Sequence, residues 1–150
     1  MIIETPRLIM YAVDKQAIQV MEAQHYDNGP HIAEHIKKLE IDSSLYGWGS
    51  WLILRKSDEV LMGDAGFKGK PNSSKEVEVG YGFLEAYWGM GYATEAVSGL
   101  IDWAFKTSAV TKVIAETDSD NAASIRVLEK NRMKKTHEAA GMIYWEMAAR

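Results

Sequence analysis

Residues 88–96, with the sequence Trp-Gly-Met-Gly-Tyr-Ala-Thr-Glu-Ala, could form a glycine-rich turn that leads directly into a helix. Gly89 and Gly91 have no Cβ, so the backbone can adopt left-handed dihedral angles and successive N–H groups can converge on one anion. The positive end of the helix dipole adds to this attraction. Ala93 is small enough to let a ligand approach closely, and the Thr94 hydroxyl offers a further donor. This chemistry suits a phosphate group.

The glycine pattern differs from two well-known phosphate-binding motifs. No Gly-Lys-Ser/Thr follows it, as it would in a P-loop, and the third glycine of the dinucleotide fingerprint is missing. Glycine-rich turns between a strand and a helix also have purely structural uses. The turn alone therefore leaves both a phosphate site and a plain connection open.

Composition limits the classes of function. A chain of 150 residues, 47% hydrophobic and 25% charged, fits one globular domain over residues 1–150. The net charge of −4 argues against nucleic acid as the partner. Residues 87–105 are too charged for a membrane span and no signal peptide is visible, so we expect no membrane partner and a cytoplasmic protein. Without cysteine there is neither a thiolate metal ligand nor a cysteine nucleophile.

These residues need secondary-structure elements to position them. Hydrophobic periodicity and turn residues predict seven strands, over residues 8–13, 51–56, 61–70, 76–83, 112–117, 133–139 and 143–148. They also predict four helices, over residues 14–25 with Asp14 as the N-cap, 32–41, 93–104 and 121–130. This order predicts an α/β fold with a mixed sheet and helices on both faces.

A second pattern of a different class lies at His31, Glu34 and His35, which match the H-x-x-E-H motif of inverted zinc peptidases. The two histidines would lie one helical turn apart, as zinc ligands do. However, the segment follows Pro30 directly, and no distant Glu stands out as a third ligand. We expect no metal and keep the zinc peptidase as an alternative.

Two segments together resemble the GCN5-related N-acetyltransferase (GNAT) family: Ala-Thr-Glu-Ala at 93–96 and Asn-x-x-Ser-x-Arg-Val-Leu-Glu-Lys at 121–130. Residues 5–8, Thr-Pro-Arg-Leu, are similar to the opening strand of the branch that contains the ribosomal-protein alanine N-acetyltransferases. The resemblance covers nearly the whole chain. It implies the acyl-CoA N-acyltransferase fold, a mostly antiparallel sheet of six to seven strands. In this fold the strands at 76–83 and 112–117 would splay apart.

The resemblance implies acetyl-CoA as the co-substrate, with its pyrophosphate on the backbone amides of the glycine-rich turn. Its pantetheine arm would pair with strand 76–83, and Asn121 would bind the arm near the thioester. Trp88 stands where the family signature has Gln or Arg, and we interpret it as a packing residue that shapes the loop. The implied cofactor-binding residues are Val79, Tyr81, Phe83, Trp88, Gly89, Met90, Gly91, Tyr92, Ala93, Thr94, Asn121 and Ser124. Candidates for the ribose 3'-phosphate are Arg126, Lys130, Arg132, Lys134 and Lys135.

The implied reaction is transfer of the acetyl group to a primary amine by direct attack in a ternary complex, because a chain without cysteine cannot form an acetyl-cysteine. The candidate base is Glu78, and the candidate proton donor to the thiolate is Ser124. The alternative for Glu78 is a solvated carboxylate on a strand, and the alternative for Ser124 is an ordinary serine in a helix. Many family members have a tyrosine where this chain has Leu128, and this departure keeps a non-catalytic acetyl-CoA-binding module open.

The acceptor amine, a protein N-terminus or a small molecule, is not identified by the sequence, and the chain could be a monomer or a homodimer. We expect the acceptor side to be lined by aromatic residues, namely Tyr26, Tyr46, Trp48 and Trp51, with Tyr81, Tyr144 and Trp145 nearby. The alternative for such residues is a place in the hydrophobic core.

Overall fold

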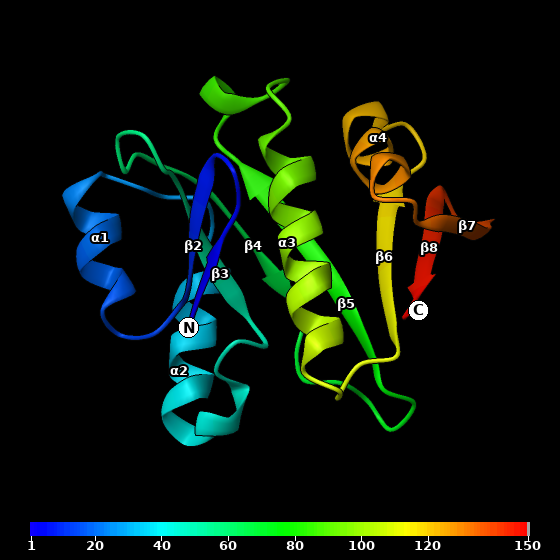
Figure 1. The fold of residues 1–150 in the computed structure, drawn as a ribbon, viewed down its shortest axis with the longest axis horizontal. Helices are drawn as coiled ribbons and strands as arrows, with labels where there is room; N and C mark the ends of the chain where they lie inside the picture. Colours follow the sequence, from blue (N-terminus) through cyan, green and yellow to red (C-terminus); the bar gives the residue numbers. More distant parts are fainter. Residues whose placement is uncertain (150) are drawn as a thin grey trace.

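The computed structural model describes residues 1–149, which form one eight-stranded sheet with helices on both faces (Figure 1). The strands are β1 (Ile2–Glu4), β2 (Leu8–Ala12), β3 (Ser50–Arg55), β4 (Leu61–Phe67), β5 (Glu76–Phe83), β6 (Lys112–Asp118), β7 (Lys134–Ala139) and β8 (Met142–Ala148). The helices are α1 (Ala17–Ala23), α2 (His31–Ile41), α3 (Tyr92–Lys106) and α4 (Ala122–Lys130), with short 3-10 turns η1 (Ser43–Leu45) and η2 (Glu85–Tyr87). No helix in this described part of the chain is long and apolar enough to cross a bilayer.

The strand order is β1-β2-β3-β4-β5-β6-β8-β7, and every neighbouring pair except β5 and β6 is antiparallel. The predicted fold class is therefore confirmed. The predicted strand number was too low, because β1 has only three residues and shows no alternating pattern. The first helix also begins later than predicted: Asp14 accepts a hydrogen bond from the Gln16 N–H, and α1 starts at Ala17.

Two hydrophobic cores hold the helices to the sheet. On one face, the predicted apolar stripe of α3 is buried, with Ala96, Val97, Leu100 and Ala104 inaccessible to solvent. It packs on residues from strands β2 to β6. On the other face, α1 and α2 pack on β3 and β4 through a smaller cluster that includes Ile32. The two sides of the sheet are therefore each covered, and the functional cavities lie where this cover is incomplete.

The sheet opens between β5 and β6. Their parallel pairing joins Glu76 to Lys112 and ends where Glu78 meets Ile114, although both strands continue beyond these residues. The Glu78 carbonyl accepts a hydrogen bond from β4, so the alternation of the strand turns the Tyr81 backbone away from β4, toward the gap. The predicted splay of these two strands is confirmed.

Candidate active site

The glycine-rich turn has the geometry of an anion site. Gly89 and Gly91 have positive φ angles of 76° and 81°, a conformation that favours glycine, and Gly91 is the N-cap of α3. The Glu95 N–H bonds to the Gly91 carbonyl at 3.1 Å. The N–H groups of Tyr92 and Ala93 lie before this bond, at the open end of a 15-residue helix. Together with the helix dipole they can bind a phosphate.

The N-terminal segment holds this turn in place. The Arg7 guanidinium donates to the Glu95 carboxylate at 2.7 Å and to the Met90 carbonyl at 2.9 Å, and its plane lies over the Tyr92 ring. The Thr5 hydroxyl and the Arg7 N–H also donate to Glu95. Burial alone would raise the pKa of Glu95, but these hydrogen bonds outweigh it and lower the pKa. The sequence singled out residues 5–8 only by resemblance, and their contact with the turn was not predicted.

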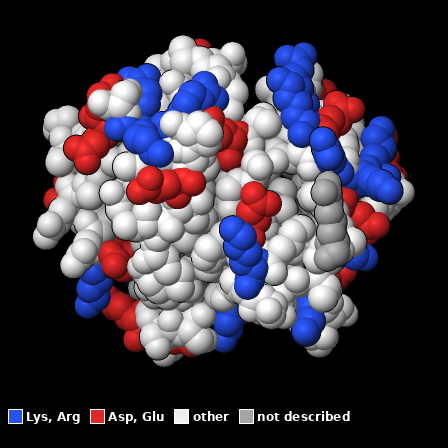
Figure 2. Space-filling model, in the orientation of Figure 1, with Lys and Arg blue, Asp and Glu red and all other residues white. Residues whose placement is uncertain are grey.

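A cavity of about 410 Å³ lies between the turn and the start of α4. Figure 2 shows a hollow in this region, with Lys and Arg side chains gathered on the α4 side. Arg126 and Lys130 line the cavity, whereas Arg132, Lys134 and Lys135 do not. Of the predicted cofactor residues, those that line it are Tyr81, Phe83, Trp88, Gly89, Gly91, Tyr92, Ala93, Thr94, Asn121 and Ser124. Val79 and Met90 are not among the lining residues.

Several side chains shape this cavity. The Trp88 indole N–H donates to the Phe83 carbonyl at 2.7 Å and ties the turn to the end of β5, which agrees with a loop-shaping role. Asn121 caps α4, because its side chain accepts from the Ser124 N–H at 3.1 Å. Leu128, at the position where relatives often have tyrosine, is fully buried in the core.

Tyr81 lies between this cavity and a second one. Its hydroxyl donates to the Ser124 carbonyl at 3.1 Å, and burial raises the pKa of the phenol. Tyr81 and Gly82 line both cavities, so the two spaces adjoin near the carboxyl end of β5.

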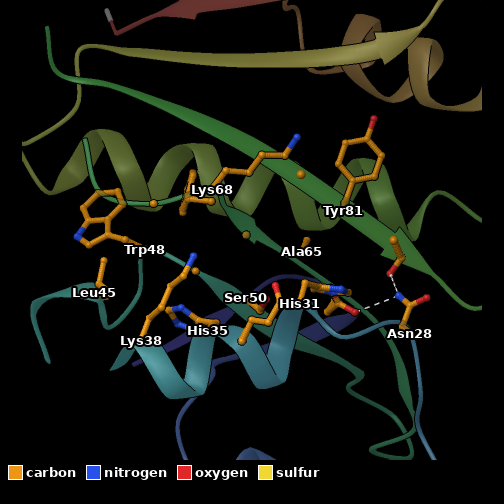
Figure 3. Close-up of a pocket in the computed structure, with 18 residues that line it drawn as sticks. Asn28, His31, His35, Lys38, Leu45, Trp48, Ser50, Ala65, Lys68 and Tyr81 are labelled. Atoms are coloured by element: carbon orange, nitrogen blue, oxygen red, sulfur yellow. Dashed lines mark hydrogen bonds and ion pairs between the residues drawn. The ribbon is translucent and has the colours of Figure 1, made fainter. Parts of the chain in front are cut away.

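The second cavity, of about 600 Å³, lies between α2 and the β4–β5 pair. Gly66, Gly80 and Gly82 contribute backbone to its lining. In Figure 3, Asn28 and Tyr81 lie toward one end of it, and Trp48 lies at the other. A molecule in this cavity would therefore reach the first cavity beside Tyr81.

Asp64 is the centre of a buried hydrogen-bond network on this second cavity. It is 4% exposed and accepts from the Tyr26 hydroxyl at 2.6 Å and from the Asn28 amide at 3.0 Å. The His31 Nε2 lies 2.6 Å from its other carboxylate oxygen. Burial first, and then the charge of Asp64, raises the pKa of Tyr26, so this phenol stays a donor. The sequence offered no sign of this network, because its members come from two segments more than thirty positions apart.

Comparison with known proteins decides the family. Residues 6–134 match the family model described as an acetyltransferase (GNAT) domain. The chain belongs to the GNAT acetyltransferase family. The N-acetyltransferase YjdG of Bacillus subtilis is 27% identical to it over 96% of both chains. A second relative from that organism, YoaA, is 26% identical over 89% of this chain and 83% of its own length.

Solved GNAT structures share the fold. The ribosomal L7/L12 alpha-N-protein acetyltransferase RimL superposes with a TM-score of 0.79 at 17% identity, covering 99% of this chain and 98% of RimL. The ribosomal-protein-S5-alanine acetyltransferase of Vibrio fischeri gives a TM-score of 0.76 at 16% identity, covering 99% and 96%. The predicted family and enzyme class, an N-acetyltransferase, are confirmed.

In this GNAT acetyltransferase, Glu78 forms an ion pair with Lys68, with 2.7 Å between the carboxylate and Nζ. Lys68 lines the second cavity, but Glu78 lines neither of the two. The neighbouring carboxylate of Glu76 binds different partners, Asn72 and Lys112. One carboxylate oxygen of Glu78, Oε2, is therefore bound to Lys68.

The two histidines of the H-x-x-E-H pattern lie in different surroundings. His31, the first residue of α2, is bound to Asp64, whereas His35 is 9% exposed and its ring packs against Gly49. Burial, and then the charge of Lys38, lowers the pKa of His35. The His35 Nε2 has no hydrogen-bond partner within residues 1–149. The family assignment explains the chain without the peptidase alternative.

Seven aromatic residues were expected on or near the acceptor side. Of these, only Trp48 and Tyr81 line the second cavity. Trp51 is completely buried beside Trp103, because alternation along β3 points its side chain into the larger core. The remaining four make other contacts: Tyr26 with Asp64, Tyr46 with the Met1 amino group, Tyr144 with His137 and Trp145 with Thr117.

Proposed function

We propose that the protein transfers the acetyl group of acetyl-CoA to a primary amine by direct attack in a ternary complex. The observation that carries this proposal is the junction of the two cavities at Tyr81 and Gly82. One cavity would hold the cofactor and the other the amine, so the thioester and the nucleophile would meet at the junction. Such positioning is itself a large part of catalysis.

The first cavity suits coenzyme A in three respects. The start of α3 offers oriented N–H groups to the pyrophosphate, and the gap beside β5 exposes the Tyr81 backbone to the pantetheine arm. Arg126 and Lys130 on the rim would bind the ribose 3'-phosphate. RimL, whose structure in complex with coenzyme A has a TM-score of 0.76 to this chain, supports this assignment.

Two hydroxyl groups lie where the thiolate of coenzyme A would leave. Ser124 is the donor predicted from the sequence, and it lines the first cavity at the start of α4. The Tyr81 phenol lies next to it, held by the Ser124 carbonyl. A hydrogen bond from either hydroxyl would stabilise the developing negative charge on sulfur.

The sequence predicts Glu78 as the base, and the Glu78→Gln variant tests that prediction. The acceptor is proposed only as a primary amine, either a protein N-terminus or a small molecule.

The test is an assay of free coenzyme A thiol with acetyl-CoA and a panel of amines: peptides that begin with Ala or Ser, spermidine, an aminoglycoside and free amino acids. We expect thiol release that depends on one class of amine, with a matching gain of 42 Da, the mass of an acetyl group, on that amine. Acetyl-CoA binding without thiol release on any amine would instead favour the non-catalytic binding module.

A further inference from the structure

His31 and Asp64 form a paired histidine and carboxylate on the wall of the second cavity. The His31 Nε2 lies 2.6 Å from Asp64 Oδ1, and the side chains are 46% and 6% exposed. A carboxylate only accepts hydrogen bonds, so Nε2 carries the proton in the neutral ring and Nδ1 carries the lone pair. No hydrogen bond to Nδ1 is formed among residues 1–149; this nitrogen lies on the side of Gly29 and can accept a proton.

The pair is connected to the junction of the cavities by one further side chain. The Asn28 amide donates to Asp64 Oδ2 at 3.0 Å and to the Gly82 carbonyl at 3.1 Å. Figure 3 shows Asn28, His31 and Tyr81 around the same end of the cavity. The imidazole is therefore held near the backbone that both cavities share, where an amine would have to lose its proton.

We propose that His31 is the general base for the acceptor amine, and that Asp64 is the positioning residue that orients its ring. This inference rests on the proposed acetyl transfer. It deepens that function by replacing Glu78, whose carboxylate is bound to Lys68 and lies outside both cavities. His31 needs no ion pair to open before it can accept a proton at Nδ1.

The proton balance of the step is complete. The amine enters as an ammonium ion and gives one proton to His31 Nδ1, directly or through one water molecule. Its lone pair attacks the thioester carbon, a C–N bond forms and the C–S bond breaks. The second proton that nitrogen loses on becoming an amide goes to the departing sulfur. His31 then releases its proton to solvent.

Several other charged or titratable groups surround His31. Glu34, His35 and Lys38 come from its own helix, and all three line the cavity. Asp64 comes from β4, Lys68 directly follows β4, Tyr81 comes from β5 and Tyr26 from the segment before α2. Asp64 is in direct contact with the ring and stabilises the imidazolium once it forms.

The experiment begins with wild-type protein, acetyl-CoA and the amine panel. Absence of thiol release with every amine would refute the proposed function itself. With the most active amine, we expect His31→Gln to lower kcat by about 100-fold or more, the usual contribution of a general base. The acidic limb of the pH profile, which is the fall of the wild-type kcat toward low pH, should disappear in His31→Gln. The dissociation constant of acetyl-CoA should stay unchanged, because His31 does not line the cofactor cavity.

Two further variants separate catalysis from structure. In His31→Ala, added imidazole should restore part of the lost rate. In Asp64→Asn, kcat should fall while KM for acetyl-CoA stays unchanged, because the ring loses the carboxylate that fixes its orientation and Asp64 does not line the first cavity. The matched control is His25→Asn, an exposed histidine with a φ of 53° that asparagine tolerates, and it should keep wild-type kinetics.

The inference is overturned if His31→Gln keeps both its kcat and its acidic limb while the wild type is active. It is equally overturned if Glu78→Gln, and not His31→Gln, removes that limb.

Discussion

Tyr81 and Ser124 are the two residues proposed to stabilise the leaving thiolate in a chain that has Leu128 where many relatives have tyrosine. Leu128 is buried in the core, so a hydroxyl for the leaving thiolate has to come from another residue. The Tyr81 hydroxyl already contacts the Ser124 carbonyl, and both residues line the cofactor cavity. The loss of one tyrosine therefore leaves two other hydroxyl groups at the leaving-group end.

The first prediction concerns these hydroxyls. Tyr81→Phe and Ser124→Ala remove one donor each, and we expect the variant that loses the functional donor to lower kcat by about 100-fold. Because burial raises the pKa of Tyr81 above its ordinary value of 10.0, the phenol stays protonated and should cause no loss of activity up to that pH. Thiol-release kinetics from pH 6 to 10 measure both effects. Wild-type kcat in both single variants would exclude a side-chain proton donor at this position.

How well single residues could be predicted depends on whether their role is local. Asn121 caps α4 and Gly91 caps α3, and both roles follow from neighbours within a few residues. The Asp64 network joins residues more than thirty positions apart, so no local sequence pattern predicts it. His31 was noticed for a metal motif, whereas its partner in the fold is a carboxylate on another strand.

At the scale of elements, the turn before α3 combines a left-handed backbone with an anion site. Substitution of Gly91 should therefore have two separable costs, one in stability and one in cofactor affinity. Gly141 has the same φ of 81°, but nothing lies within 4 Å of the place where its Cβ would be. Substitution of Gly141 would therefore have the cost in stability alone, because Gly141 lies outside the turn before α3.

We expect Gly91→Ala and Gly141→Ala each to lower the free energy of unfolding by about 1–2 kcal/mol, the cost of a left-handed residue with a Cβ. Only Gly91→Ala should also raise KM for acetyl-CoA, because its Cβ would lie 3.2 Å from the Arg7 guanidinium. Urea denaturation and initial-rate kinetics measure the two effects. An equal rise of KM in both variants would mean that the turn does not bind the cofactor.

Arg7, in the N-terminal segment, holds the turn before α3 through the Met90 carbonyl. We expect Arg7→Met to raise KM for acetyl-CoA by about tenfold, equivalent to about 1.4 kcal/mol, because the turn loses its tie to the Met90 carbonyl. kcat at saturating acetyl-CoA should change little. Lys15→Met, which removes an exposed ion pair with Glu40, is the control and should leave KM unchanged. An unaltered KM in Arg7→Met would show that the turn keeps its shape without this contact.

Helices and strands that carry a long hydrophobic pattern were predicted well. The stripe of α3 and the splay of β5 and β6 are as expected, whereas β1 was missed and α1 begins late. Three residues cannot display a period, and Asp14 forms a local turn instead of a cap. The acceptor cavity was placed only in outline, because whether an aromatic side chain faces the core or the cavity depends on packing across the sheet.

Across the whole molecule, His35 makes stability depend on pH. Its lowered pKa means that the unfolded chain takes up a proton near the ordinary value of 6.5, whereas the folded protein does so only at lower pH. This contribution to stability is complete above that value and falls as the pH drops below it. The main cause is the burial of the ring, which lies beside Gly49 on the wall of the second cavity.

We therefore expect Tm to fall between pH 7.5 and pH 5 by more in the wild type than in His35→Phe, which cannot be protonated at this position. Thermal unfolding at the two pH values measures the difference. His25→Asn serves as the control and should keep the wild-type dependence. Equal losses of Tm in the wild type and His35→Phe would show that other groups account for the acid sensitivity.

The tie between Arg7 and Glu95 spans 88 positions of the chain. If the turn depends on this contact, as the Arg7→Met prediction states, it would reach its final shape only after the first strands have docked on α3. Acetyl-CoA would then bind only chains in which the two distant parts have already met, and it would stabilise those chains by mass action. Its cellular concentration would thereby help to set how much of this protein is folded.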